Sequence, residues 1–365
     1  MRFTVDQKEL STAVQNVQRA VSTKTNMPAL EGILLEASGS SLTLSAYDLE
    51  LGMQTDIPAK IQEEGATILQ ARLFSEIVRR APGETVTITS DNKNIISIES
   101  GKSVTTIVGI NAEEFTEFPT INSSMTPITL DGELIKSMIR QTIFAVADTD
   151  AKPIHQGSLF NAKGGILDVV SVDGFRLAVR REKISSDINM SFVVPKKTLN
   201  EVLKLTTDGK VEIYPDKRNI MFRINNYTLV SSLLEGEFLD YEAAIPKRCE
   251  TTLTVKTRDF IDSVERVSLI ISDRLKSPVR CLFGSDQVKL TSTTAIGRSF
   301  DSFEAKLEGN ELEIGFNNKY LLDALRNTEC DEITLRMNDS LKPLVINPKD
   351  SDSFIFIVLP VRLRN

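Results

Sequence analysis

Hydrophobic and polar positions follow the same order three times along the chain, at a period of about 120 residues. Each copy opens with a short strand, after which apolar residues recur at helical spacing, as at Leu134, Ile135 and Met138. These openings lie at 3–21, 128–146 and 253–271. We therefore predict an amphipathic helix near the start of each copy.

Each copy continues with strand and turn patterns in one order. Alternating polar and β-branched residues predict a strand pair, a second amphipathic helix follows, and then a hairpin with Asn, Asp, Gly or Pro at its turn. The second strands of the pairs are expected at 42–51, 167–177 and 288–298, the second helices at 71–81, 195–205 and 317–327, and the hairpins at 86–100, 211–224 and 333–348.

Connectors that contain proline follow the first two copies and place domain boundaries near residues 125 and 249. We predict three domains, at 1–125, 126–249 and 250–365. Two helices with antiparallel strands indicate an α+β domain whose helices are segregated to one face of the sheets. Such a domain leaves strand edges exposed, so tandem copies can join edge to edge into a curved array. The array forms a ring if its symmetric contacts close and a filament if they do not.

The composition is that of a globular protein, with 41% hydrophobic and 25% charged residues. No apolar run approaches the roughly 20 residues of a membrane helix, and the first residues lack the apolar core of a signal peptide. Three widely spaced cysteines, Cys249, Cys281 and Cys330, indicate neither a disulfide framework nor a cysteine zinc site. We expect a cytoplasmic protein, associated with the nucleoid if it binds DNA.

The formal net charge of −7 argues against an ordinary DNA-binding surface. Cationic residues nevertheless recur on the predicted helices of all three copies. Each alone fits a solvated helix face, whereas their recurrence fits a locally basic lumen if the helices line a ring. The residues that we assign to a DNA-facing surface on this basis are Arg72, Arg79, Arg80, Lys136, Arg140, Lys196 and Lys197.

Few residues offer catalytic chemistry. His155 is the single histidine, so neither a zinc site nor a histidine-based triad can be assembled from the sequence. Residues 101–103 resemble the end of a phosphate loop, but position 96 is Ile rather than Gly, and a hairpin turn fits better. Capping and solvation explain the carboxylates at strand ends and in loops better than acid/base pairs do. These carboxylates are Asp48, Asp148, Asp150 and Asp173. We predict that the protein is not an enzyme and holds no metal or cofactor.

Three motifs carry a family resemblance. They are Asp-Gly-x-Arg-Leu-Ala at 173–178, Gly-Phe-Asn-x-x-Tyr-Leu-x-Asp at 315–323 and Leu-Pro-x-Arg-Leu at 359–363. Together with the segments 26–53 and 236–246, they make the whole chain resemble the bacterial sliding clamp, the beta subunit of DNA polymerase III. This resemblance implies a head-to-tail homodimer, in which six similar domains form a closed ring around duplex DNA with helices inside and sheets outside. It also implies binding of the replicative polymerase, the clamp loader and repair proteins, and no catalytic residue.

The resemblance further implies a partner groove between the second and third domains, which takes a short motif of the Gln-Leu-x-Leu-Phe kind. Carried over by position, the groove residues are His155, Val172, Gly174, Phe175, Arg176, Leu177, Leu239, Asn317, Tyr320, Leu341, Pro343, Ile357, Val358, Leu359, Pro360, Val361 and Arg362. Burial in the core is an equal alternative for Leu177 and Val358, whereas Arg176 and Arg362 are expected to be exposed. Because Pro360 has no amide hydrogen, the chain should leave the sheet there and form a lip of the groove, the alternative being a mobile tail.

Four positions depart from the family pattern. Many members have an aliphatic residue in place of His155 and a His or similar polar residue in place of Phe175. Many also have a Pro in place of Leu239 and a basic residue in place of Ala243. These four positions affect the details of the groove rather than the ring. By resemblance, the subunit contact sets Thr105 and Ile107 against Ile270 and Ile271 of the other copy, and Lys24 matches a DNA-contacting loop position. Two rival functions stay open, a repeat-built interaction scaffold that does not encircle DNA and a metal-dependent nuclease or hydrolase, although no cluster of metal ligands supports the second.

Overall fold

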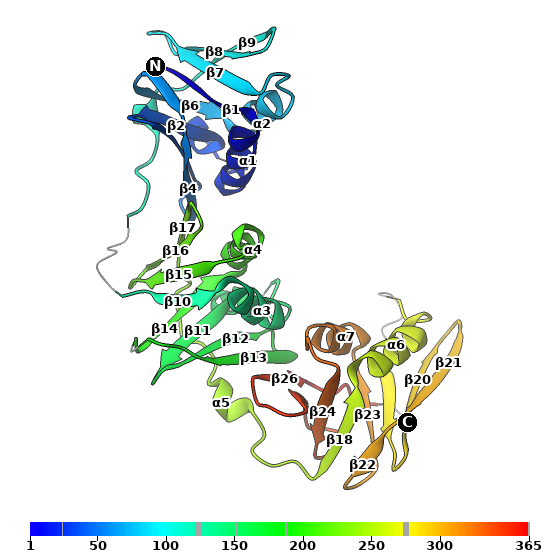
Figure 1. Cartoon of the computed structure of the whole chain (residues 1–365). Coiled ribbons are helices and arrows are strands. Elements are labelled where there is room, and N and C mark those ends of the chain that lie inside the picture. The colour runs from blue at the N-terminus through cyan, green and yellow to red at the C-terminus, as the bar shows by residue number, and fades with distance from the viewer. Residues whose placement is uncertain (24, 121–125, 150–151, 187, 273–276, 364–365) are drawn as a thin grey trace. The chain divides into compact units, whose positions relative to one another are not determined.

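Figure 1 shows the computed structural model of the chain, which describes residues 1–365 except 24, 121–125, 150–151, 187, 273–276 and 364–365. The chain divides into two compact units, Met1–Glu133 with Lys197–Leu233, and Leu134–Lys196 with Leu234–Asn365. Within the described residues, no helix is both long and apolar enough to cross a lipid bilayer.

Two antiparallel sheets form the first unit. In the part of the chain that the structure describes, an eight-stranded sheet has the order β10-β15-β16-β17-β4-β3-β2-β6 and a five-stranded sheet the order β5-β1-β7-β8-β9. The pairing of β17 with β4 joins strands of the predicted second domain to the first, edge to edge, as expected from tandem copies. The strands of this unit are β1 (Arg2–Asp6), β2 (Gly32–Ser38), β3 (Ser41–Tyr47), β4 (Leu51–Pro58), β5 (Lys60–Glu63), β6 (Gly65–Gln70), β7 (Thr85–Ser90), β8 (Ile95–Ser100), β9 (Ser103–Val108), β10 (Ile128–Asp131), β15 (Lys210–Pro215), β16 (Asn219–Ile224) and β17 (Tyr227–Ser232).

Helices of the first unit begin where the sequence supplies a cap. The carboxylate of Asp6 accepts hydrogen bonds from the backbone N–H groups of Lys8 (2.8 Å) and Glu9 (3.0 Å), which starts α1. The buried face of α1 includes Leu10 and Val14, and the helix contacts β3 and β4 of one sheet and β1 of the other. The helical segments are α1 (Gln7–Val17), α2 (Ala71–Arg79) and α4 (Lys196–Leu205), with the short turns η1 (Gln18–Ala20), η2 (Pro28–Glu31) and η3 (Ala112–Glu114).

The second unit repeats this construction. Among its described residues, a nine-stranded sheet has the order β14-β11-β12-β13-β26-β25-β24-β18-β22 and a four-stranded sheet the order β21-β20-β19-β23. The pairing of β13 with β26 joins the predicted second and third domains. The strands are β11 (Gly157–Lys163), β12 (Ile166–Val172), β13 (Arg176–Lys183), β14 (Met190–Pro195), β18 (Thr251–Lys256), β19 (Val279–Phe283), β20 (Gln287–Thr294), β21 (Gly297–Glu304), β22 (Lys306–Glu308), β23 (Leu312–Phe316), β24 (Glu332–Met337), β25 (Leu344–Pro348) and β26 (Phe354–Val358).

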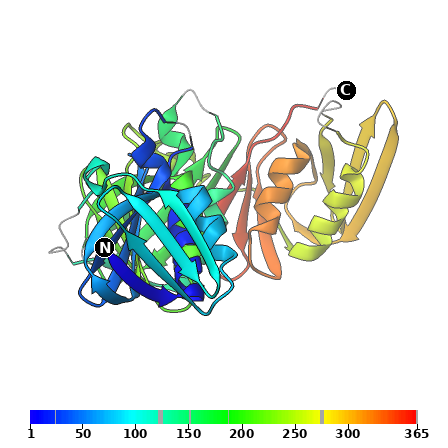
Figure 2. The ribbon, with the colours of Figure 1, turned by 90° about the horizontal axis from the view of Figure 1, so that it is seen from above.

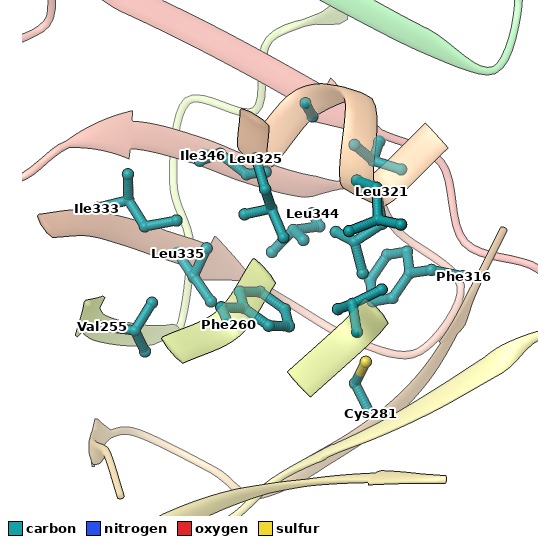
Figure 3. Packing of buried hydrophobic residues seen from close by; sticks show 14 of the residues in the cluster. Val255, Phe260, Cys281, Phe316, Leu321, Leu325, Ile333, Leu335, Leu344 and Ile346 are labelled. Carbon is teal, nitrogen blue, oxygen red and sulfur yellow. The ribbon is translucent and has the colours of Figure 1, made fainter. Parts of the chain in front are cut away.

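Two helices of the second unit, α6 and α7, lie side by side (Figure 2), and α6 contacts β18 of the nine-stranded sheet and β20 and β21 of the four-stranded sheet. Phe260, Phe316 and Leu321 are fully buried in the core that these elements share (Figure 3). Each such side chain contributes roughly 1.5–3 kcal/mol by leaving water. The helical segments of this unit are α3 (Gly132–Ile143), which begins at the end of the first unit, α5 (Tyr241–Ala244), α6 (Thr257–Ser268), α7 (Asn318–Arg326) and the turn η4 (Pro153–Gln156).

The predicted order of elements is confirmed in the described residues. The second helices, α2, α4 and α7, begin at Ala71, Lys196 and Asn318, where 71, 195 and 317 were expected. Residues 101–103 lie at the tight turn from β8 into β9, with Gly101 at φ +58°, so the hairpin interpretation is correct. The two compact units divide the predicted middle domain, because its strands belong to both large sheets. The domain boundaries at 125 and 249 stay a prediction.

Candidate functional site

The turn between β12 and β13 is the first element of the candidate groove. The carboxylate of Asp173 accepts hydrogen bonds from the backbone N–H groups of Phe175 and Arg176, both 3.0 Å, and Gly174 has a φ of +84° that favours glycine. This Asx turn presents Phe175 outward, and the residue is 55% exposed. Asp173 therefore caps the turn, as the sequence indicated.

Arg176 is buried, with 8% exposed, which corrects the expectation of an exposed side chain. Its Nε donates to Asp173 Oδ2 at 2.9 Å and its Nη1 to Asp323 Oδ2 at 2.5 Å. The guanidinium carbon also lies 4.7 Å from the centroid of the Tyr320 ring and 5.5 Å from that of Phe144. Two carboxylates and two aromatic rings thus compensate the loss of water around this cation.

Tyr320 contacts both Arg176 and the exposed ring of Phe175. Its ring stacks on that of Phe175 with centroids 5.5 Å apart and an angle of 20°. Asn317 fixes the start of α7, since its side chain accepts from the backbone N–H groups of Lys319 (3.0 Å) and Tyr320 (3.3 Å). Asn317 therefore acts on the groove by placing Tyr320.

The terminal segment runs beside these rings. Leu359 donates its backbone N–H to the Phe175 carbonyl at 2.9 Å, and Val361 donates to the Gly315 carbonyl at 2.8 Å. Gly315 makes this approach possible, because a Cβ there would meet the carbonyl oxygen of Val361 at 2.8 Å. Pro360 follows the end of β26, and the chain leaves that strand, as predicted, and runs along β23. Its role as a lip of the groove stays a prediction.

The remaining groove residues separate by burial. Val172, Leu177 and Ile357 belong to one buried apolar cluster and Val358 to another, so they underlie the surface rather than line it. The exposed large apolar side chains at the site are Phe175, Leu239, Leu341, Leu359 and Val361. Arg362 is exposed as expected, His155 is buried with its ring 5.4 Å from that of Phe238, and Pro343 and Pro360 are partly buried.

Two clefts border the exposed apolar residues. One of about 360 Å³ is lined by Tyr320, Val361 and Ile271, among others. Another of about 580 Å³ is lined by Leu239 with Phe238 and Ile154. A peptide that presents apolar side chains could bury them in such hollows, with a few polar groups fixing its direction.

The first unit contains the same turn in a different chemical form. The carboxylate of Asp48 accepts hydrogen bonds from the backbone N–H groups of Glu50 (3.0 Å) and Leu51 (2.7 Å), as that of Asp173 does in the second unit. Leu49 has a φ of +77° and takes the place of Gly174. The Glu50 carbonyl accepts from the Ser232 N–H, just as the Phe175 carbonyl accepts from the Leu359 N–H. Here an ion pair takes the place of the aromatic stack.

That ion pair joins Asp48 to Lys197, a residue that we assigned to the DNA-facing surface. The same backbone turn therefore carries charge in the first unit and aromatic surface in the second. Repeat alignment could have exposed the paired roles of Asp48 and Asp173. Gly315 and Asp323 belong to the motif at 315–323, but the motif alone did not indicate what either residue contacts.

Among the described residues, the other assigned cations lie on helices or, in the case of Arg80, directly after one, and several are ion-paired. Arg79 and Arg80 both contact Glu76, at 2.7 and 3.0 Å, and Arg140 contacts Glu329 at 3.2 Å. Lys196 contacts Asp148 at 2.7 Å, and the hydrogen bond from Lys196 lowers the pKa of that carboxyl below its usual value. Arg72 is exposed, Lys136 is partly buried, and Lys24 lies outside the described residues.

The predicted subunit-contact residues lie on one edge strand and just after one helix. Thr105 and Ile107 are on β9, the outermost strand of the five-stranded sheet, and Thr105 lines a cleft of about 460 Å³ together with Arg80. Ile270 and Ile271 follow α6, and Ile271 also packs against the buried core. Sequence reasoning missed the exposed apolar residues beside them, namely Val104 and Val108 on β9, Leu269 after α6, and Ile296 and Phe300 at the edge strand β21.

No group of His, Cys, Asp and Glu side chains suited to a metal ion is found among the residues that the structure describes.

Comparison with known proteins gives matches along the whole chain. Models of the DNA polymerase III beta subunit match with its N-terminal domain at residues 1–120, its central domain at 129–240 and its C-terminal domain at 242–362. The Beta sliding clamp of Bacillus subtilis is 31% identical over 377 residues, covering 99% of this chain and 100% of the relative. The crystal structure of the DNA polymerase sliding clamp from Bacillus subtilis matches with a TM-score of 0.97 at 30% identity, and that of a sliding clamp from Bartonella birtlesii bound to griselimycin with 0.92 at 28%, each over 100% of both chains. The chain therefore belongs to the DNA polymerase III beta subunit family.

Proposed function

We propose that this protein is a DNA sliding clamp, which encircles duplex DNA and tethers the replicative polymerase and other DNA-processing proteins for processive synthesis. The observation that carries this proposal is the end-to-end match to beta sliding clamps, with all three domain models in order. The clamp is a tether and not an enzyme, and its work needs no cofactor. It acts in the cytoplasm, at the nucleoid.

The ring in this proposal is a head-to-tail homodimer of three domains per copy, at 1–125, 126–249 and 250–365. Both large sheets already continue across the joints between these domains, through β17 with β4 and β13 with β26. In the part of the chain that the structure describes, β9 and β21 are edge strands, and both carry exposed apolar residues. Pairing β9 of one copy with the edge of the third domain of another would bury those residues and complete the ladder. Thr105 and Ile107 then meet Ile270 and Ile271.

DNA passes through the ring, and its phosphates contact the cationic side chains that we assigned to the DNA-facing surface through electrostatic attraction. Exposed ion pairs such as Arg79 with Glu76 contribute only about 0–1 kcal/mol, so phosphates can compete for the cations. Such contacts position the duplex without reading bases and weaken with salt. Arg80 lines the cleft beside β9, so the subunit contact is a second role open to it.

Partners bind through short motifs of the Gln-Leu-x-Leu-Phe kind in the groove formed by Phe175, Tyr320, Leu239 and the terminal segment. The exposed apolar surfaces at these residues support the assignment, since a monomeric surface seldom leaves such side chains together without a partner. The polymerase, the clamp loader and repair proteins would compete for this one groove in each copy.

Topology-dependent retention on DNA tests the clamp function. Protein loaded on nicked circular DNA by its clamp loader is expected to co-elute with the circle through gel filtration and to be lost after the circle is cut, because a ring slides off a free end. A rival scaffold that does not encircle DNA would be lost equally from circular and linear molecules. Equal loss would thus overturn the proposal, and direct binding without the loader should be weak and strongly reduced by salt.

A charge on either edge is expected to separate the dimer. Val108 is 77% exposed in the single copy, so Val108→Asp should leave the subunit folded but bury an unpaired carboxylate in the contact, which costs several kcal/mol. Light scattering at micromolar concentration should then give 40.5 kDa in place of about twice that mass. Ile270→Asp tests the opposite edge, and Ile166→Asp, an exposed apolar position outside both edges, is the matched control. A dimer that persists in both variants would contradict the interface assignment.

A further inference from the structure

The connector between the predicted second and third domains is fixed against the nine-stranded sheet of the second unit. Its first contact is the hydrogen bond from the Leu234 backbone N–H to the Val193 carbonyl, at 3.0 Å. Further along, the ring of Phe238 meets that of His155 edge to face, with centroids 5.4 Å apart. Tyr241, at the start of α5, is then buried against the sheet. The intervening residues carry Leu239, the exposed apolar residue of the candidate groove.

Tyr241 reaches a row of polar residues that cross three neighbouring strands. Asn161 on β11, Asp168 on β12 and Arg181 on β13 are direct cross-strand partners. The Tyr241 hydroxyl donates to Asp168 Oδ2 at 2.8 Å and accepts from Asn161 Nδ2 at 3.0 Å. Arg181 holds both oxygens of the same carboxylate, through Nε at 2.7 Å and Nη2 at 2.6 Å. The phenol therefore completes the hydrogen bonding of a buried carboxylate.

This row lies on the same face of the sheet as Val172 and Leu177, two buried residues beneath the candidate groove. Because side chains alternate along a strand, Asp168 shares its face with Val170 and Val172, and Arg181 shares its face with Val179 and Leu177. The apolar members of that face form a single buried cluster, against which Tyr241 and Phe238 pack. Leu177 is the second residue of β13, next to the turn that presents Phe175. One face of the sheet thus supports the aromatic side of the groove at one end and the connector at the other.

We infer that Tyr241 is a positioning residue for the partner groove, which holds the connector so that Leu239 stands as a preformed wall. This inference rests on the proposed function of the groove. A segment that is already ordered loses less conformational entropy when a peptide binds, so fixing it raises affinity without adding a contact. Burial raises the pKa of Tyr241 to about 12, and the phenol consequently remains a donor to Asp168 at neutral pH.

The test is a double-mutant cycle on peptide affinity in the full-length protein. Tyr241→Phe removes the hydroxyl and keeps the ring, and we expect a Gln-Leu-x-Leu-Phe peptide to bind about fivefold more weakly. Leu239→Ala removes the wall side chain itself. If Tyr241 acts through Leu239, adding Tyr241→Phe to Leu239→Ala should change the affinity by less than twofold, whereas independent effects would multiply.

Tyr214 provides a matched control. It is also a buried tyrosine whose hydroxyl donates to a carboxylate, Glu212 at 2.8 Å, but it lies on β15 in the other unit. Tyr214→Phe should leave peptide affinity unchanged even where it lowers the melting temperature as much as Tyr241→Phe does. Asn161→Ala, which removes the donor to the same phenol, is the second variant and should act in the same direction as Tyr241→Phe. Hydrogen exchange gives an independent readout, since Tyr241→Phe should speed exchange of amides 236–240.

The outcomes separate this inference from the proposed function. Failure of the wild-type protein to bind the peptide would overturn the groove. Binding by the wild type with equal affinity in Tyr241→Phe and Asn161→Ala, or effects that multiply with Leu239→Ala, would overturn the positioning role while leaving the groove in place. A fivefold loss of peptide affinity in Tyr241→Phe supports the positioning role, provided that Tyr214→Phe does not show it and that it disappears in the Leu239→Ala background.

Discussion

Removal of residues 359–365 is expected to weaken binding of a Gln-Leu-x-Leu-Phe peptide at least tenfold while leaving the dimer intact. Leu359 and Val361 are 39% and 38% exposed, and hydrogen bonds to Phe175 and Gly315 hold them beside the aromatic pair. Covering the exposed remainder of two such side chains should contribute about 0.6–1.2 kcal/mol each, and the sum corresponds to roughly tenfold to fiftyfold in affinity. The proposed subunit contact uses other edges, so light scattering should still give a dimer.

Fluorescence anisotropy with a labelled peptide measures this effect, and removal of residues 364–365 alone is the matched control. Val361→Asp keeps the chain length and should reproduce most of the loss, because it places a charge where an apolar side chain is expected to bind. Unchanged affinity in a folded dimer of the truncated protein would exclude the terminal segment from the groove.

The repeat order could be predicted from the sequence because its signals are local. Apolar spacing specifies a helix within ten residues, and turn residues specify a hairpin within five, so α2, α4 and α7 lie where expected. The exit of the chain at Pro360 was predictable for the same reason, since a missing amide hydrogen is a property of one residue. Local rules suffice wherever a residue's conformation depends on its neighbours in sequence.

The composition of the site could not be predicted in this way. Arg176 is buried because Asp323 and Tyr320, on a helix of the next repeat, compensate its charge, and nothing near position 176 announces them. Gly315 was part of a recognised motif, yet its purpose depends on how closely Val361 approaches it. Pairing between repeats also explains why two compact units, rather than three, emerge from three copies.

Replacement of Arg176 is expected to have the largest effect of any single change at the groove. In Arg176→Ala, the carboxylates of Asp173 and Asp323 lose their partner, and the ring of Tyr320 loses the cation below it. Removing one member of a buried ion pair costs about 3–5 kcal/mol. Because Asp323 is partly exposed, water can compensate some of this loss, and we expect about 3 kcal/mol in the free energy of unfolding of the second unit.

Urea denaturation followed by circular dichroism measures that loss, and two variants define its cause. Arg176→Lys keeps the charge, but a single ammonium group cannot bind both carboxylates as the planar guanidinium does. The stability of this variant should therefore fall between those of Arg176→Ala and the wild type. Arg362→Ala removes an exposed cation from the same surface and should change the unfolding free energy by less than about 0.5 kcal/mol. If Arg176→Ala were as mild as Arg362→Ala, the ion pairs of Arg176 would contribute nothing net. The stack of Phe175 on Tyr320 would then have to hold the two sides of the groove without the cation beneath it.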